Sequence, residues 1–167
     1  LTSDKVRMKE AFVKHGLPTA KWQVFVTGTE AIRTDFIYPV IVKPALEHCS
    51  VGLTGDAVVK NAIELAFFVK KQITLFAQPM VVEEFINGAE FQVTVLDTEH
   101  GVNVLPPAEI LFDVGSPQTM LTYKSRWEED TVEYKTSHVR VNPIAPSLSA
   151  TIDRVARDAF TKLGFAD

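Results

Sequence analysis

A lysine directly follows a short run of β-branched residues near the start of the sequence. Val40, Ile41 and Val42 predict a buried strand, and Lys43 stands at its end. A lysine rooted in a strand offers a fixed positive charge of the kind that binds phosphate oxygens. The turn at Ser50–Gly52 could present backbone N–H groups to the same anion. The pattern indicates an anion site, although a lysine that merely extends into solvent would leave the same sequence.

Acidic residues follow a second apolar stretch. Glu83 and Glu84 end a predicted strand, and Glu90 lies two residues after the turn dipeptide Asn87–Gly88. A carboxylate on a strand can accept hydrogen bonds from both hydroxyls of a ribose. The backbone of a strand that leads into a turn can pair with the edge of an adenine ring. Solvated charges at a sheet edge are the alternative, but the two groups of residues together indicate a nucleotide site.

The elements that must position these residues alternate along the chain. Apolar spacing, capping residues and turn dipeptides predict helices at residues 4–16, 29–35, 61–75 and 148–163, and strands at 22–26, 38–43, 80–86, 90–96 and 102–112. Two prolines make the last of these strands irregular or an edge. Residues 113–137 are polar and predict a long mobile loop. The pattern is α+β, with Asn87–Gly88 as a hinge.

Composition bounds the class of protein. The chain has 167 residues, of which 46% are apolar and 23% charged, as in a soluble globular protein of one domain or two small lobes. A net charge of −4 provides no electrostatic argument for nucleic acid or an anionic membrane. No apolar run approaches the ~20 residues of a membrane span. The single cysteine excludes an internal disulfide and fits a reducing compartment. We therefore expect a cytoplasmic protein with neither a nucleic-acid nor a membrane partner.

Four segments resemble motifs of the ATP-grasp ligases, and within them the D-alanine–D-alanine ligases, over nearly the whole chain. DKVRMKEAFVKHGLPTAKW resembles their opening segment, YPVIVKPALEHCSVGL their phosphate-contacting strand and loop, VVEEFINGAEFQVTVL their adenine hinge, and LTYKSRWEEDTVEY their flexible lid. The resemblance implies an ATP-grasp fold, with lobes at residues 1–86 and 87–167 and the nucleotide cleft between them.

The resemblance also implies which residues bind the nucleotide, ATP. Lys5 and Lys43 would contact its phosphates, Glu90 its ribose, and Arg126 in the lid its γ phosphate. The full set of nucleotide-binding residues would be Lys5, Lys43, Ser50, Glu83, Glu84, Phe85, Ile86 and Glu90. The segment Glu83–Ile86 would contact adenine.

Two positions depart from the family pattern. The phosphate loop commonly carries a glycine followed by two serines, but this chain has His48–Cys49–Ser50. The lid commonly has a lysine before its aromatic residue, but this chain has Arg126 before Trp127. The positive charge of the lid is kept, while the approach of the altered loop to the phosphates is in question.

The family's magnesium ligands are an aspartate in an Arg-x-Asp strand and a later Glu-x-Asn segment, and both are expected beyond residue 167. No metal ligand is therefore predicted within the chain, and the family's N-terminal lobe is expected before Leu1. The sequence is expected to be a central fragment that is inactive alone and binds ATP weakly. Its parent would use ATP and Mg²⁺, and the resemblance leaves room for a homodimer.

The implied reaction is the ATP-dependent joining of a carboxylate to an amine. ATP would phosphorylate the carboxylate of D-alanine or a similar amino acid, and the acyl phosphate would be attacked by a second amine, as in peptidoglycan precursor synthesis. Two alternatives stay open. The substrate could be another amino acid or a hydroxy acid, or the chain could be a non-catalytic nucleotide-binding or interaction module.

Overall fold

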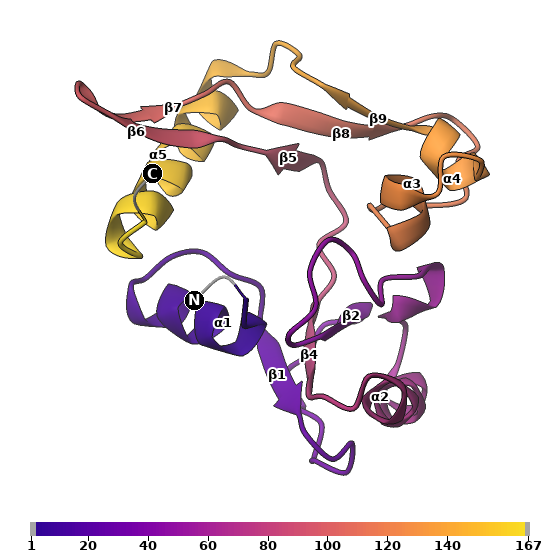
Figure 1. Cartoon of the computed structure of the whole chain (residues 1–167). Coiled ribbons are helices and arrows are strands. Elements are labelled where there is room, and N and C mark those ends of the chain that lie inside the picture. The colour runs from indigo at the N-terminus through magenta and orange to yellow at the C-terminus, as the bar shows by residue number, and fades with distance from the viewer. Residues whose placement is uncertain (1–2, 166–167) are drawn as a thin grey trace.

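The computed structural model describes residues 3–165, whose helices and strands form two groups that face each other (Figure 1). The first group contains the elements up to residue 84, and the second contains those from residue 90 onward. Residues 85–89 join β4 of the first group to β5 of the second. Helices and antiparallel sheets are mixed in both groups, so the predicted α+β class is confirmed.

The bounds of the elements are as follows. The first group comprises α1 (Lys5–Lys14), β1 (Trp22–Phe25), β2 (Val40–Pro44), the 3₁₀ turn η1 (Gly55–Ala57), β3 (Val58–Val59), α2 (Ala62–Phe76) and β4 (Met80–Glu84). The second group comprises β5 (Glu90–Gln92), β6 (Val95–Thr98), β7 (Gly101–Val104), β8 (Ala108–Phe112), α3 (Tyr123–Trp127), α4 (Val132–Lys135), β9 (Ser137–Arg140) and α5 (Pro146–Lys162). None of the helices in the described part of the chain combines the length and apolar character needed to cross a membrane.

Side-chain caps explain where the helices of the first group begin. The Asp4 carboxylate accepts hydrogen bonds from the N–H groups of Val6 and Arg7 at the start of α1. The Asn61 side chain accepts one from Glu64 at the start of α2. Both caps satisfy N–H groups that have no partner inside the helix. The predicted starts of these two helices are therefore confirmed.

The first sheet has the order β1–β4–β2–β3, and all of its pairs are antiparallel. In this register Glu83 of β4 lies opposite Ile41 of β2, and Lys43 of β2 lies opposite Val81. Side chains that stand directly opposite or two residues apart point to the same face of a sheet. The register therefore places Lys43 and Glu83 as diagonal neighbours on one face.

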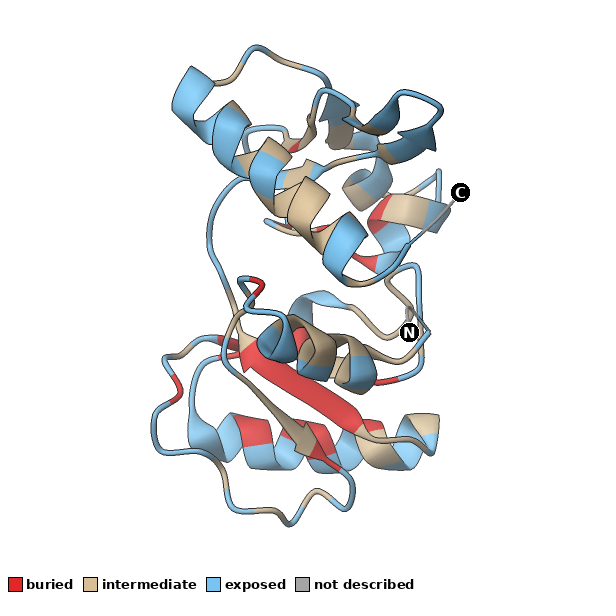
Figure 2. Ribbon diagram, turned by 90° about the vertical axis from the view of Figure 1, so that its left-hand side faces the viewer, coloured by how far each residue is buried: buried red, intermediate tan, exposed pale blue. Residues whose placement is uncertain are grey.

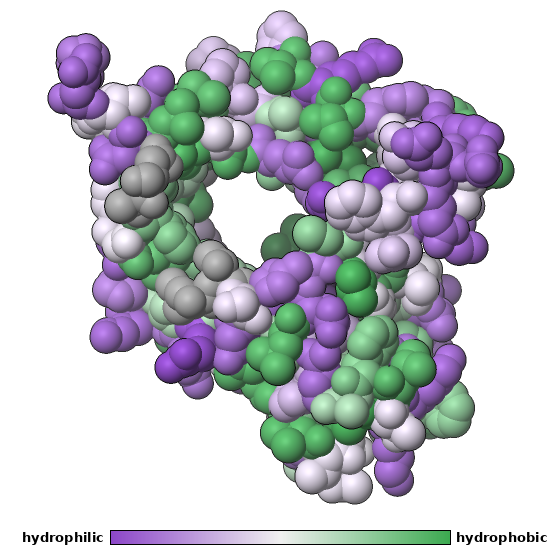
Figure 3. All heavy atoms as spheres, in the orientation of Figure 1, coloured by the Kyte–Doolittle hydropathy of each residue, from purple (hydrophilic) through white to green (hydrophobic). Residues whose placement is uncertain are grey.

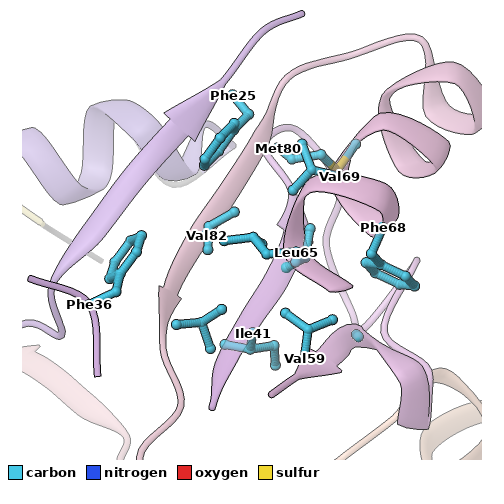
Figure 4. Packing of buried hydrophobic residues seen from close by; sticks show 12 residues of the cluster. Phe25, Phe36, Ile41, Val59, Leu65, Phe68, Val69, Met80 and Val82 are labelled. Carbon is cyan, nitrogen blue, oxygen red and sulfur yellow. The ribbon is translucent and has the colours of Figure 1, made fainter. Parts of the chain in front are cut away.

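The other face of this sheet packs on α2 and forms the hydrophobic core. Leu65 and Val69 of α2 are fully buried, as are Val40 and Val82 of the sheet. Figure 4 shows these α2 side chains against the strands, and Figure 2 shows that buried residues concentrate in the first group. The second group has a thin core, because α5 contains no buried residue among those described. The rigid side of the molecule is therefore the first sheet.

The second group contains a three-stranded sheet, β5–β8–β9, and a two-stranded sheet, β6–β7. The predicted strand at residues 102–112 is divided at Pro106–Pro107 into β7 and β8, which belong to different sheets. This division confirms the predicted irregularity, because proline has no N–H to donate to a sheet. The predicted strand at residues 90–96 was wrong as a single element, because it is divided into β5 and β6, which belong to different sheets. Its alternation of exposure is present, with Phe91 and Val93 less exposed than their neighbours. The assignment of lobes to residues 1–86 and 87–167 stays a prediction.

Two further predictions of local structure were wrong. Residues 29–35 form no helix, because the Glu30 carboxylate instead accepts the N–H groups of Val26, Thr27 and Gly28 and closes a turn. Residues 113–137 are not a loop throughout, because they contain α3 and α4 and lead into β9. Thr122 and Thr131 cap these two short helices. Neither helix is long enough to show an apolar period in the sequence.

The core predicts a large difference between two leucines of α2. Replacing the fully buried Leu65 with alanine should lower the free energy of unfolding by about 2–5 kcal/mol, because a cavity forms where its side chain packed. Leu75→Ala on the same helix is the matched control, because Leu75 is 67% exposed, and its effect should stay within about 0.5 kcal/mol. Urea denaturation followed by circular dichroism measures both. Equal losses would contradict this account of the core.

Candidate functional site

A cleft of about 480 Å³ lies between the two groups of elements. Figure 3 shows the space between the groups as an opening, with hydrophilic and hydrophobic side chains on its edge. Every site residue predicted from the sequence lines this cleft except Lys5. Those lining it are Lys43, Ser50, Glu83, Glu84, Phe85, Ile86, Glu90 and Arg126. Lys5 lines a smaller neighbouring cavity of about 160 Å³, which Lys43 and Ser50 share.

Lys43 is held by Glu83 across the first sheet. Its Nζ pairs with Glu83 Oε1, and Lys9 of α1 pairs with Glu83 Oε2. The Lys9 and Glu83 side chains are each only 12% exposed. Burial acts to raise the pKa of the Glu83 carboxyl, but the charges of Lys43 and Lys9 outweigh it and hold the pKa below its ordinary value. In this structure the strand-end lysine therefore has a carboxylate partner inside the cleft.

Lys5 is bound by backbone carbonyl groups at the end of β2. Its Nζ donates to Pro44 O at 2.9 Å and also to Glu47 O. Burial lowers the pKa of the Lys5 ammonium, and the positive charge of Lys43 lowers it further. Lys5 and Lys9 lie one turn apart on α1, so both reach the same strands. The helix thus brings two lysines to Lys43.

The hinge after β4 is held by hydrogen bonds to the first group. The N–H groups of Glu84 and Phe85 donate to Lys21 O and Pro39 O, each at 3.0 Å. The Glu84 carboxylate accepts the N–H of Ile37 at 3.0 Å and lies 3.9 Å from Lys21 Nζ, so its partners are Ile37 and Lys21 rather than Lys9 and Lys43. The two adjacent glutamates, which look equivalent in the sequence, therefore have different roles.

The loop after β2 requires unusual backbone angles. Cys49 and Ser50 have φ values of 53° and 63°, and Gly52 has a φ of 79°. A Cβ atom on Gly52 would lie 2.7 Å from Pro44 Cγ, so only glycine fits there. This geometry curls the loop back onto the end of β2, beside Lys43.

The segment at residues 113–137, which corresponds to the predicted lid, is docked on this loop. The Trp127 indole Nε1 donates to Cys49 O at 2.9 Å, and the Tyr123 N–H donates to Leu53 O at 3.0 Å. Ser50 Oγ also lies 3.4 Å from the carbonyl oxygen of Leu121. The lid is therefore closed over the loop in this structure, and its predicted mobility stays a prediction.

Arg126 projects from α3 into the cleft. Its Nε is buried and donates to no acceptor among residues 3–165. A buried guanidinium N–H without a partner is costly, so such a group favours an anionic ligand that would accept its hydrogen bond. The alternative of an idle charge in solvent does not account for the buried Nε.

Some residues of the cleft were missed from the sequence. Lys9 could have been found, because it lies four residues after Lys5 on one helical face. The others carry no chemical signal and come together only by folding: Thr19, Ala20, Ile41, Leu53, Met120 and Leu121. They give one part of the cleft an apolar lining beside Phe85 and Ile86. A cleft of this size with apolar walls and a few charged groups is typical of small-molecule sites.

The residues described do not fit a bound magnesium ion. Within residues 3–165 no three side chains of His, Cys, Asp or Glu are grouped closely enough to hold a metal. Mg²⁺ needs several oxygen ligands in octahedral geometry. The one buried carboxylate of the cleft, Glu83, is already paired with two lysines.

Comparisons with known proteins agree on one family. The family model described as D-ala D-ala ligase C-terminus matches residues 12–167. An uncharacterized protein of Sinorhizobium fredii is 36% identical over 76% of this chain and 36% of its own length. A D-alanine–D-alanine ligase of Pseudomonas fluorescens is 32% identical over 81% of this chain and 39% of its own length. The chain thus spans well under half the length of these relatives.

Solved structures show the same fold. The VanG D-Ala:D-Ser ligase of Enterococcus faecalis has a TM-score of 0.71 at 23% identity, covering 98% of this chain and 46% of its own. The D-alanine–D-alanine ligase of Bacillus anthracis in complex with ATP has a TM-score of 0.67 at 17% identity, covering 96% and 46%. The L-amino acid ligase of Bacillus licheniformis has a TM-score of 0.66 at 19% identity, covering 98% and 34%. The predicted ATP-grasp fold is confirmed.

The lowered pKa of Glu83 predicts how stability depends on pH. A carboxyl whose pKa is lower in the folded state stabilises the fold above its unfolded pKa of roughly 4.3, and this contribution is lost as the pH falls through the folded pKa. Glu83→Gln should destabilise the protein at pH 7, because two half-buried lysines, Lys9 and Lys43, lose their counter-charge. The difference in unfolding free energy between parent and variant should narrow below about pH 4.3.

Urea denaturation between pH 7 and pH 3 measures this difference. Glu10→Gln is the matched control, since Glu10 is exposed on α1 outside the cluster. A difference in unfolding free energy between the unsubstituted chain and Glu83→Gln that stayed constant down to pH 3 would contradict the lowered pKa of Glu83.

The lid contact predicts a change in local exchange. Trp127→Phe keeps an aromatic ring but removes the N–H that donates to Cys49 O. Losing one hydrogen bond of about 1 kcal/mol should speed amide exchange in residues 113–137 by roughly fivefold. Hydrogen–deuterium exchange detected by mass spectrometry measures this, with Trp22→Phe in β1 as the control. Unchanged exchange in the lid would show that the indole bond does not hold it closed.

Proposed function

This chain belongs to the family of the D-Ala–D-Ala ligase C-terminal domain, and we propose that it is the ATP-binding part of an ATP-dependent carboxylate–amine ligase. The observation that carries the proposal is the cleft itself. It brings the strand-end lysine, the hinge, Glu90 and the unpartnered Nε of Arg126 around one space of nucleotide size. No other described cavity collects as many of these groups.

In this proposal the nucleotide lies along the cleft in one orientation. Adenine packs between Ile41 and the hinge residues Phe85 and Ile86, which supply the apolar walls. The ribose hydroxyls donate to the Glu90 carboxylate at the start of β5. These contacts leave the charged end of the cleft for the triphosphate.

The phosphates lie at the end of β2 and under the lid. Lys43 binds the α and β phosphates, and Lys5 approaches them from the neighbouring cavity. Ser50 donates a hydrogen bond from the strained loop. Arg126 covers the γ phosphate, to which its buried Nε donates. A guanidinium in a closed, water-poor site stabilises the charge that develops during phosphoryl transfer.

The proposed reaction has two steps. An oxygen of the substrate carboxylate attacks the γ phosphorus of ATP. The bond between that phosphorus and the bridging oxygen of ADP breaks, ADP leaves with the bonding electrons, and an acyl phosphate forms. The amine of a second substrate then attacks the acyl carbon, the C–O bond to the phosphate breaks, and inorganic phosphate leaves with the bonding electrons. The amine nitrogen releases one proton, to the departing phosphate or to water, and an amide remains. Closure of residues 113–137 over the phosphates would exclude water, which would otherwise hydrolyse the acyl phosphate. No step is assigned to a metal ion, because the described residues supply no site for one.

D-Alanine is the proposed substrate, in the synthesis of a peptidoglycan precursor in the cytoplasm. The support is the group of relatives named D-alanine–D-alanine ligase, at 28–32% identity. The solved neighbours include a D-Ala:D-Ser ligase and an L-amino acid ligase, so the fold itself is compatible with other amine and carboxylate substrates. The nucleotide cleft is common to all these possibilities.

Nucleotide binding to the purified chain tests the proposal. Isothermal titration should detect adenosine, ADP and ATP at the same site. Lys43→Ala should weaken ADP and ATP by roughly tenfold to a hundredfold, the effect of a lost charge-assisted hydrogen bond of ~1.5–3 kcal/mol, while adenosine changes little. Arg126→Ala should weaken ATP more than ADP, because it faces only the γ phosphate.

Lys14→Ala is the matched control for Lys43→Ala, since it removes an exposed lysine at the end of α1. It should bind all three ligands as the parent does. The proposal would be overturned if the unsubstituted chain and Lys43→Ala bound ATP with equal affinity. It would also be overturned if adenosine did not compete with ATP for binding.

A further inference from the structure

Among the positively charged residues of the cleft within the described chain, Lys9 is the one that the proposed function leaves without a task. We propose that Lys9 is a positioning residue, which holds Glu83 so that Lys43 stays fixed and positively charged toward a phosphate. This inference rests on the proposed nucleotide function, which it deepens.

The geometry fixes Lys9 from two sides. Its Nζ donates to Thr19 Oγ1 at 2.7 Å, and it pairs with Glu83 Oε2. Thr19 belongs to the segment between α1 and β1, and Glu83 belongs to β4. With its side chain only 12% exposed, Lys9 has little freedom to move elsewhere. Lys9 therefore links α1 to β4, an inner strand of the first sheet.

The two oxygens of Glu83 are shared between the two lysines. Oε2 is taken by Lys9, and Oε1 by Lys43. Because the carboxylate is held at both ends, its position sets the position of the Lys43 ammonium. Without Lys9 the carboxylate would be free to turn, and Lys43 would turn with it.

The charge of the cluster depends on Lys9 as well. Two ammonium groups and one carboxylate leave a net charge of +1 on this face of the sheet. Removing Lys9 leaves Lys43 neutralised by a glutamate of its own, so the pair attracts phosphate less. Removing both Lys9 and the Glu83 charge restores a net charge of +1, carried by Lys43 alone. Lys9 thus acts through Glu83 rather than on the nucleotide.

This charge count predicts a suppressor. Lys9→Met should weaken ATP and ADP by roughly fivefold to twentyfold, at or below the lower end of the effect of losing a direct charge-assisted hydrogen bond, and should leave adenosine nearly unchanged. Adding Glu83→Gln to Lys9→Met should recover most of the lost ATP affinity. Lys9→Arg, which keeps the charge, should also restore part of it.

The measurements are isothermal titrations of the purified chain with adenosine, ADP and ATP, beside urea denaturation of each variant. A merely structural role for Lys9 would lower stability without changing the ratio of ATP to adenosine affinity. If Lys9 instead contacted the phosphates directly, adding Glu83→Gln to Lys9→Met would not recover the lost ATP affinity. Either result would overturn the inference. If Lys9→Met fails to fold, Lys9→Arg and the double variant carry the same comparison.

The outcome is separable from that of the proposed function. If Lys43→Ala weakens ATP as expected while Lys9→Met keeps the parent's ratio of ATP to adenosine affinity, the inference on Lys9 alone fails. If the unsubstituted chain binds no ATP, the proposed function is wrong, and the inference on Lys9 is wrong with it. Lys14→Met, a substitution of the same kind on the exposed end of α1, is the control for both.

Discussion

The carboxylate of Glu83 is the group on which the geometry of the cleft depends. The Glu83 side chain is 12% exposed and lies on β4, an inner strand of the first sheet, between lysines from α1 and β2. Removing one partner of a buried ion pair costs about 3–5 kcal/mol, because the remaining charge keeps its desolvation penalty. Three elements that are distant in the sequence are therefore tied together at one point. The same point determines where a phosphate-binding lysine can be.

The first sheet can carry this cluster because its other face is so well packed. Val40, Val42 and Val82 alternate along their strands with the cleft residues Ile41, Lys43 and Glu83. The three valines belong to the same buried cluster as Leu65 and Val69 of α2. Side chains alternate between the two faces of a strand, so one face can be a core while the other is a site. The rigid core thus holds charged residues that would otherwise move in solvent.

The second group of elements contributes contacts rather than a core. The lid reaches the phosphate loop through Trp127 and Tyr123, whose N–H groups donate to the backbone carbonyl oxygens of Cys49 and Leu53. Every residue has a backbone carbonyl oxygen, whatever its side chain, so the unusual Cys49 does not prevent the lid from docking on the loop. The closure of the cleft is therefore set by the path of the loop, which Gly52 permits.

Local sequence patterns predict most of the helices and strands and their order along the chain. The caps at Asp4 and Asn61 and the β-branched run before Lys43 were each sufficient to predict the element concerned. The alternation after Glu90 predicted extended chain but not its division into β5 and β6. The resemblance of four segments added the fold and most residues of the cleft. What the patterns missed were short elements: the helices α3 and α4 span five and four residues, which is too few to show a period.

The sequence by itself determined which side chains are able to bind a nucleotide, because charge and hydrogen-bonding capacity belong to the residue type. Only the tertiary structure decided which of them act together. Glu83 and Glu84 are neighbours in the chain, yet one holds two lysines and the other holds the backbone of Ile37. Lys9 is 74 positions from Glu83 in the numbering and pairs with it directly. Alternation along β4 points Glu83 and Glu84 to opposite faces of the sheet, and the position of α1 beside that sheet brings Lys9 to Glu83. Neither arrangement is visible before the chain folds.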